Sequence, residues 1–162
     1  MAIKSAYLNF QFSIVEELEG LVDGLSLKQV THDALGKTAL NLSGTTTPPV
    51  VRAHTDTKTG GAATIDLTAM PTITGNYDAT GKKLRAILVE CKTGSLGKLT
   101  VGPGGVNPYP LFGTGITPEL PVSGRMMVYF ADGLPAVAAG VKNITFTPTN
   151  AADSFDVILV VG

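Results

Sequence analysis

The chain has 162 residues, the length of one domain and enough to bury about two thirds of the surface that the unfolded chain exposes. Its formal net charge of −1 leaves no basic surplus to neutralise a phosphate backbone, so the composition argues against nucleic-acid binding. Charged residues make up only 15%, while glycine and proline number 19 and 10, which favours short strands, tight turns and a surface partly covered by partner molecules.

The N-terminal region begins with a pattern typical of a half-buried strand at residues 6–14, where apolar and polar residues alternate. The apolar positions of this strand are Leu8, Phe10, Phe12 and Ile14. Residues 14–22 have helical spacing, but Gly20 interrupts them and the stretch is too short to be a stable helix alone. One or two helical turns and an irregular acidic loop therefore remain as alternatives there.

A hairpin and a boundary are expected next. Residues 27–32 and 38–42 have strand character, and a turn containing Gly36 is expected between them at residues 33–37. Pro48 and Pro49 then stop any sheet, because each lacks a backbone N–H donor. The sequence therefore predicts an N-terminal arm and hairpin at residues 1–47 and a β-sandwich domain at residues 48–162.

After this boundary short strands recur at regular intervals, without strong helices or tandem repeats. They are expected at residues 50–55, 63–68, 84–91, 98–101, 125–131, 143–147 and 155–161, with a glycine turn at Gly60 and Gly61 and a polar loop at residues 70–81. This pattern predicts an all-β protein with a single antiparallel β-sandwich. The lack of tryptophan and of a cysteine pair counts against an immunoglobulin domain, and the long connections at residues 70–81 and 101–124 favour a jelly-roll-like form with an N-terminal extension.

The segment at residues 82–92 is expected to be the centre of the core. Its interior, residues 84–91, is mostly apolar on both faces, which predicts a strand covered above and below, next to the closing strand at residues 155–161. On this basis Leu88→Ala should cost about 2–5 kcal/mol of stability through the cavity it leaves. The single cysteine, Cys91, is expected to be an inert buried thiol.

No residue set has the spacing of a catalytic, cofactor-binding or metal-binding site, so no such residue, no cofactor and no enzymatic activity are expected. His32 and His54 have no companion ligand, and the acidic residues Glu16, Glu17, Glu19 and Asp23 lack the pattern of a calcium loop. Residues 75–83 superficially resemble a phosphate loop but lead into a strand, and residues 102–105 contain Pro103. Neither residues 43–44 nor residues 94–95 form a nucleophile elbow.

Two further patterns concern partners and location. Tyr77, Tyr109 and Phe112 lie in expected loops, where aromatic rings could stack on sugars, although packing over one end of the sandwich is preferred. The first ten residues lack the apolar stretch of a signal peptide, and the longest apolar run, residues 157–161, is far below membrane-spanning length. We therefore expect a protein made in the cytoplasm, without a membrane partner.

Residues 45–162 carry three segments of strand and turn signatures that are similar to a known group of proteins. They are AATIDLT (62–68) with TGKK (80–83); LTVG (99–102) with NPY (107–109) and LFG (111–113); and AGVKNI (139–144) with FDVILVVG (155–162). In these segments the chain resembles the head decoration or cement proteins of tailed bacteriophages, which are minor capsid proteins, and related phage structural proteins. Residues 2–22 match no pattern of this group.

The resemblance implies a non-catalytic virion structural protein that decorates or cements a bacteriophage capsid through subunit contacts. Its implied partners are the major capsid protein and further copies of itself, with a trimer favoured, and its implied location is the capsid surface after assembly in the host cytoplasm. Residues 2–13, or the segment around Pro48 and Pro49, are expected to contact a neighbouring subunit. The alternative is a carbohydrate-binding β-sandwich module of a phage fibre or a secreted enzyme.

Overall fold

The computed structural model describes residues 6–17, 29–42, 52–72, 75–92, 95–113, 115–131 and 134–162. All regular structure in these ranges is β, and they contain no helix long and apolar enough to cross a membrane. The strands are β1 (Ala6–Glu17), β2 (Gln29–Leu42), β3 (Arg52–Thr59), β4 (Ala63–Asp66), β5 (Met70–Thr72), β6 (Gly75–Tyr77), β7 (Leu84–Cys91), β8 (Leu99–Pro103), β9 (Glu119–Leu120), β10 (Arg125–Tyr129), β11 (Asn143–Pro148) and β12 (Ser154–Val161).

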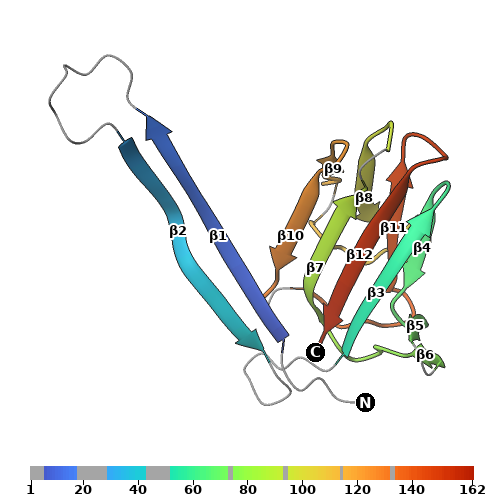
Figure 1. The fold of residues 1–162 in the computed structure, drawn as a ribbon. Helices are drawn as coiled ribbons and strands as arrows, with labels where there is room; N and C mark the ends of the chain where they lie inside the picture. The colour runs from blue at the N-terminus through green and yellow to red at the C-terminus, as the bar shows by residue number, and fades with distance from the viewer. Residues whose placement is uncertain are drawn as a thin grey trace, which may run out of the picture.

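Two four-stranded antiparallel sheets pack face to face and form the body of the protein (Figure 1). The first sheet has the strand order β10-β7-β12-β3 and the second has the order β4-β11-β8-β9. The short strands β5 and β6 form a small hairpin, and β1 and β2 form a separate two-stranded ladder. The prediction of an all-β antiparallel sandwich is therefore confirmed.

The core lies between the two sheets and is filled by alternate residues of each strand, as the period of two in a strand requires. The first sheet contributes Ile87 and Val89 from β7, paired with Leu159 and Val157 of β12. The second sheet contributes alternate residues of β8 and β11, among them Phe146, whose ring stacks on that of Phe155 from the first sheet at a centroid distance of 5.3 Å. The two predicted core strands, β7 and β12, are hydrogen-bonded neighbours.

The expectation that β7 is covered on both faces holds in its first half, where Arg85 and Ala86 are buried with 9% and 2% exposed, but not in its second half. Leu88 is only half-buried and lies on the outer face, opposite Ile158 and away from the core residues. At the start of the strand, Val160 pairs with Ala86 and Val161 with Leu84, so the intervening Arg85 forms a bulge. This bulge returns Leu84 to the core face, and it explains why both faces of the segment carry apolar residues.

The N-terminal ladder also differs from the expectation. Residues 33–37 do not form a turn, because β2 runs unbroken from Gln29 to Leu42 and pairs with β1 before and after the unpaired residues 35–37. The ladder accommodates the extra residues around Gly36 by a register shift between Phe10 and Phe12. Residues 14–17 are strand and not helix, while residues 18–28 lie outside the described part of the chain.

The remaining predictions concern turns, a loop and the domain boundary. The turn at Gly60 and Gly61 is confirmed, with positive φ values of 79° and 68° that suit glycine. The predicted polar loop at residues 70–81 contains the β5–β6 hairpin. The two-residue strand β9, which lies between Pro118 and Pro121, was not predicted. Residues 43–51, with Pro48 and Pro49, lie outside the described residues, so the division after residue 47 stays a prediction.

Candidate functional site

The loops of the sandwich gather at its two ends. At one end the connections 60–62, 92–98, 121–124 and 149–153 lie together, as the backbone hydrogen bonds from Gly60 to Asp153 and from Cys91 to Gly124 show. At the other end lie the longer connections 67–83, 104–118 and 130–142, joined by bonds such as that from the Val137 N–H to the Lys82 carbonyl. Any site built from loops must therefore belong to one of these two ends.

Tyr109 anchors the end with the longer connections. Its side chain is completely buried, its hydroxyl donates to the Pro135 carbonyl at 2.9 Å, and it accepts from the Leu84 N–H at 3.1 Å. Burial raises the pKa of Tyr109 above its ordinary value. A ring enclosed in this way holds three segments together and presents no face on which a sugar could stack.

The other two aromatic candidates are half-buried. Phe112 packs against Phe130 with a ring centroid distance of 6.4 Å, and both rings lie against the core cluster. Tyr77 at the end of β6 also packs against that cluster. The structure therefore does not gather Tyr77, Tyr109 and Phe112 into one exposed platform, and packing over the end of the sandwich is the arrangement observed.

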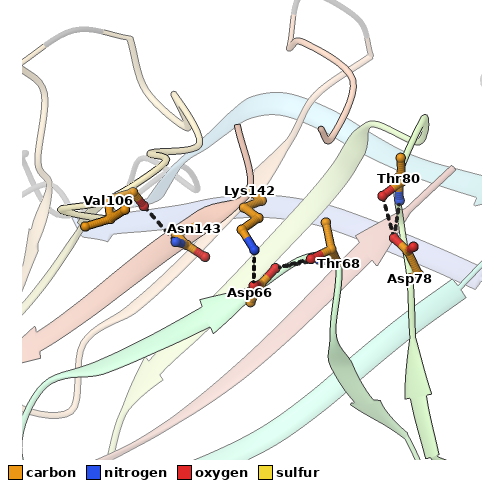
Figure 2. A network of polar contacts seen from close by, with 7 residues as sticks. All are labelled: Asp66, Thr68, Asp78, Thr80, Val106, Lys142 and Asn143. Atoms are coloured by element: carbon orange, nitrogen blue, oxygen red, sulfur yellow. Dashed lines mark hydrogen bonds and ion pairs between the residues drawn. The ribbon is translucent and has the colours of Figure 1, made fainter. Parts of the chain in front are cut away.

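A polar network orders the turns at the same end (Figure 2). Asp66 accepts hydrogen bonds from the Thr68 N–H at 2.8 Å and the Thr68 hydroxyl at 2.6 Å, and its second oxygen pairs with the Lys142 ammonium at 2.6 Å. Asp78 repeats the first of these arrangements with Thr80. Both are Asp-x-Thr segments whose side chains close a turn on their own backbone, a local role that the sequence analysis did not single out.

The second Asp-x-Thr turn lies within residues 75–83, the segment that superficially resembles a phosphate loop and that leads into a strand, as expected. The segment runs through β6, turns at Asp78 and Thr80, and passes Gly81, whose φ is 79°, into β7. At residues 102–105, a Cβ on Gly104 would lie 2.5 Å from the Asn143 Cβ. That glycine therefore allows close packing of the backbone against β11, and no anion cradle is needed to explain it.

Burial alone would raise the pKa of Asp66, but the hydrogen bonds from Lys142 and Thr68 together outweigh it and hold the pKa below its ordinary value of 3.8. A carboxylate whose pKa is lower in the folded state contributes stability above the pKa of the unfolded state, and this contribution is lost as the pH falls through the folded value. We expect Asp66→Asn to reduce the loss of stability between pH 5 and pH 2 by up to about 1 kcal/mol, since the side chain is partly exposed.

Urea unfolding of the wild type and of Asp66→Asn at pH 7, 4 and 2.5 measures this difference. Lys142→Met, which removes the ammonium and leaves the carboxylate, is the matched variant and should reduce the same slope. Equal slopes for all three proteins would mean that the Asp66 contacts contribute nothing to folding.

The candidate metal ligands are not brought together. His32 lies on β2 and His54 on β3, in different sheets, while Glu16 and Glu17 end β1. Glu19 and Asp23 lie outside the described residues. Across the described ranges no group of three or more His, Cys, Asp or Glu residues is placed to hold a metal ion.

The described residues considered as nucleophiles, Cys91 and Ser95, make contacts that stabilise the fold. Cys91 is buried, as expected, with its sulfur 3.9 Å from the Gly97 carbonyl oxygen. The Ser95 hydroxyl donates to the Ser154 carbonyl at 3.2 Å and so fixes a loop to the start of β12. Residues 43, 44 and 94 lie outside the described part of the chain.

Asp153 organises the end with the shorter connections, and sequence reasoning missed it. Its side chain is only 3% exposed, and its two oxygens accept from the Leu96 N–H at 2.7 Å and the Gly97 N–H at 2.8 Å. These bonds hold the 92–98 loop so that Leu96 projects into solvent, 80% exposed. No local pattern could reveal the role of Asp153, because its partners lie more than fifty residues earlier in the chain.

The outer surface of the first sheet carries an apolar area that the sequence did not separate from the core. Strand register places its members in two cross-strand rows, on the side opposite the core residues. We call it the outer apolar face: Ala86, Leu88, Met127, Tyr129, Ile158 and Val160. Ala86 and Val160 are buried within the chain, with 2% and 8% exposed, and the other four side chains are half-buried. The next row is charged, with ion pairs between Arg125 and Glu90 at 2.7 Å and between Lys92 and Asp156 at 3.0 Å. The face therefore has a polar border at one end.

Comparison with known proteins identifies no relative of the chain. No family model matches it, and no curated protein and no solved structure matches it significantly. Function has to be argued from the surfaces and contacts of the chain itself.

Proposed function

We propose that the chain is a non-catalytic structural subunit of a bacteriophage virion, which decorates or cements the capsid by contacts between subunits. The observation that carries the proposal is the arm formed by β1 and β2, residues 6–17 and 29–42. The arm is a two-stranded ladder to which no other described strand is hydrogen-bonded, and in Figure 1 it stands apart from the sandwich. Isolated two-stranded ladders are marginally stable in water, so an arm of this length is best explained as a part that contacts a neighbour.

The order of the sandwich strands supports the proposal. When the eight strands of the two large sheets are numbered along the chain from β3, leaving out the β5–β6 hairpin, the first sheet has the order 6-3-8-1 and the second has the order 2-7-4-5. We infer from this alternation between sheets that the domain is a jelly roll, an architecture found in viral capsid and lectin domains. Because one architecture serves many functions, the strand order supports a capsid role without specifying it.

The surface composition agrees with a part that is buried in an assembly. Few charged residues keep the chain solvated, and four large apolar side chains in the loops are exposed: Leu96, Val106, Ile116 and Val122. The proposed partners are the major capsid protein and further copies of the chain, with three copies favoured by the resemblance, at the capsid surface after assembly in the host cytoplasm. A carbohydrate-binding module remains the alternative, but the burial of Tyr109 counts against it.

Binding to capsids tests the proposal. Purified protein is mixed with empty capsids of the phage whose genome encodes it, and the pellet after sedimentation is quantified over a range of protein concentrations. We expect saturable binding at a fixed ratio to the major capsid protein, and the same ratio in purified virions by mass spectrometry. Absence from virions, together with no binding to empty capsids, would contradict the role.

A further inference from the structure

The edge strands of the sandwich differ in how they are protected against pairing with another chain. The edges are β10 and β3 in the first sheet and β4 and β9 in the second. Proteins commonly protect an exposed edge by keeping it very short or by placing charged residues on it. The strands β4 and β9 have only four and two residues, and β3 contains Arg52, Asp56 and Lys58. The five-residue strand β10, RMMVY, is charged only at its first residue, so it is the least protected of these edges.

The backbone of β10 has free hydrogen-bonding groups along its outer edge. The Phe130 N–H donates to the Arg85 carbonyl at 2.8 Å, in register with the ladder between β10 and β7. Bonded and non-bonded pairs alternate in an antiparallel ladder, so Arg125, Met127 and Tyr129 direct their N–H and C=O groups away from β7. Within the described part of the chain, no strand or loop is hydrogen-bonded to these groups. They are therefore available to a further strand.

The side of the sandwich next to this edge is apolar and incompletely covered. Met126, Val128 and Phe130 pack against the core, yet each remains half-buried, because β10 is the outermost strand of its sheet (Figure 1). Val122 in the connection from β9 to β10 is 44% exposed, and Ile116 just before β9 is 57% exposed. An added strand would cover part of this apolar side and bond to the free backbone groups at the same time.

The sequence of β10 is suited to pairing with itself. In an antiparallel pair of β10 strands centred on Met127, Arg125 lies opposite the partner's Tyr129, and Met126 lies opposite the partner's Val128. This register places the outward-directed residues of the two strands opposite one another, so each would exchange two hydrogen bonds with its counterpart. The only charged side chain of the strand meets an aromatic ring and not a like charge. The arm strands, with 12 and 14 residues, would instead extend far beyond β10.

We propose that β10 pairs antiparallel with β10 of a second copy of the chain and joins the first sheets of the two copies into one continuous sheet. The contact rests on the proposed role as an assembly subunit, and it adds the partner and the surface. A pair of this kind has a twofold axis and uses the same edge of both copies, so it ends at two copies. It is therefore separate from the threefold contact that the resemblance favours.

Light scattering after size-exclusion chromatography tests the contact through charges at its centre. A strand of five residues is only about 17 Å long, so the wild type should associate weakly, with a dimer fraction that rises with concentration. Met127→Lys and Met127→Glu each place like charges opposite one another and should weaken association at least about tenfold. An equimolar mixture of the two variants brings opposite charges together and should recover association. Thr59→Lys, on the exposed part of β3, is the matched control and should associate like the wild type.

Hydrogen exchange of the wild type followed by NMR tests the contact without any substitution. The amide N–H groups of Met127 and Tyr129 should exchange more slowly as the protein concentration rises, because pairing converts them into hydrogen-bonded groups. The N–H groups of Thr57 and Thr59 point away from β12 at the other edge of the sheet, and their exchange should not change. Circular dichroism checks that every variant used for light scattering is folded.

Each experiment has an outcome that contradicts the pairing. A wild type that stays monomeric at all concentrations excludes it, and so does exchange at Met127 and Tyr129 that does not depend on concentration. Weakened association of both charge variants without recovery in the mixture would mean that β10 meets a different strand, such as one from the arm. None of these experiments needs capsids. Dimers that do not bind capsids keep the strand contact and remove the cement role, while capsid binding by a strict monomer does the reverse.

Discussion

Truncating either Phe146 or Phe155 to alanine is expected to lower the free energy of unfolding by about 3–5 kcal/mol. Both side chains are fully buried, and they come from opposite sheets, Phe146 from β11 and Phe155 from β12. Their stacked rings are therefore a direct contact across the sandwich. Each truncation removes apolar area and leaves a cavity between sheets whose backbones are held apart by the remaining core residues.

A double-mutant cycle on the same pair separates ring contact from burial. The double variant should be less destabilised than the two single variants predict together, with a coupling of about 0.5–1.5 kcal/mol. Urea unfolding followed by circular dichroism measures all four proteins. Phe112 and Phe130, which form a half-buried pair at one end of the sandwich, give the comparison cycle and should show smaller single losses. Losses below about 1 kcal/mol at Phe146 and Phe155 would mean that the sheets do not meet there.

The fold class and most sandwich strands were predictable from the sequence because they depend on local alternation. An antiparallel strand with one face in the core shows its burial in a period of two, as in β4, β11 and β12, and the intervening glycines and prolines mark the turns. The expected strands at residues 63–68, 143–147 and 155–161 coincide with these elements to within a few residues.

Features that depend on distant partners could not be predicted. The outer face of β7 looks like a core face because a bulge at Arg85 reverses the alternation, and the bulge is defined only by the register with β12. Likewise, residues 33–37, expected to form a turn, are part of strand β2, because pairing with β1 continues on both sides of them. Asp153 and the Tyr109 hydroxyl act through backbone groups of segments remote in sequence, and no spacing rule connects them.

Ile87 and Leu88 are adjacent in β7, and their truncation is expected to have different consequences. Ile87 is 0% exposed at the centre of the core, so Ile87→Ala should cost about 2–5 kcal/mol of stability. Leu88 is half-buried on the outer apolar face, so Leu88→Ala should cost about 1 kcal/mol or less in dilute protein, below the value expected from sequence alone. Urea unfolding at low protein concentration compares the two. Similar losses would mean that the faces of β7 are assigned incorrectly.

The same two variants also probe whether the outer face is covered in an assembly. A side chain buried only between copies stabilises the fold in proportion to the fraction of associated protein, so its contribution grows with concentration. The cost of Leu88→Ala should therefore increase when unfolding is measured at higher protein concentration, whereas the cost of Ile87→Ala should be the same at both. A concentration-independent cost at Leu88 would place this residue in solvent in every state of the protein. A rising cost is the behaviour that packing of a neighbouring molecule on Leu88 requires.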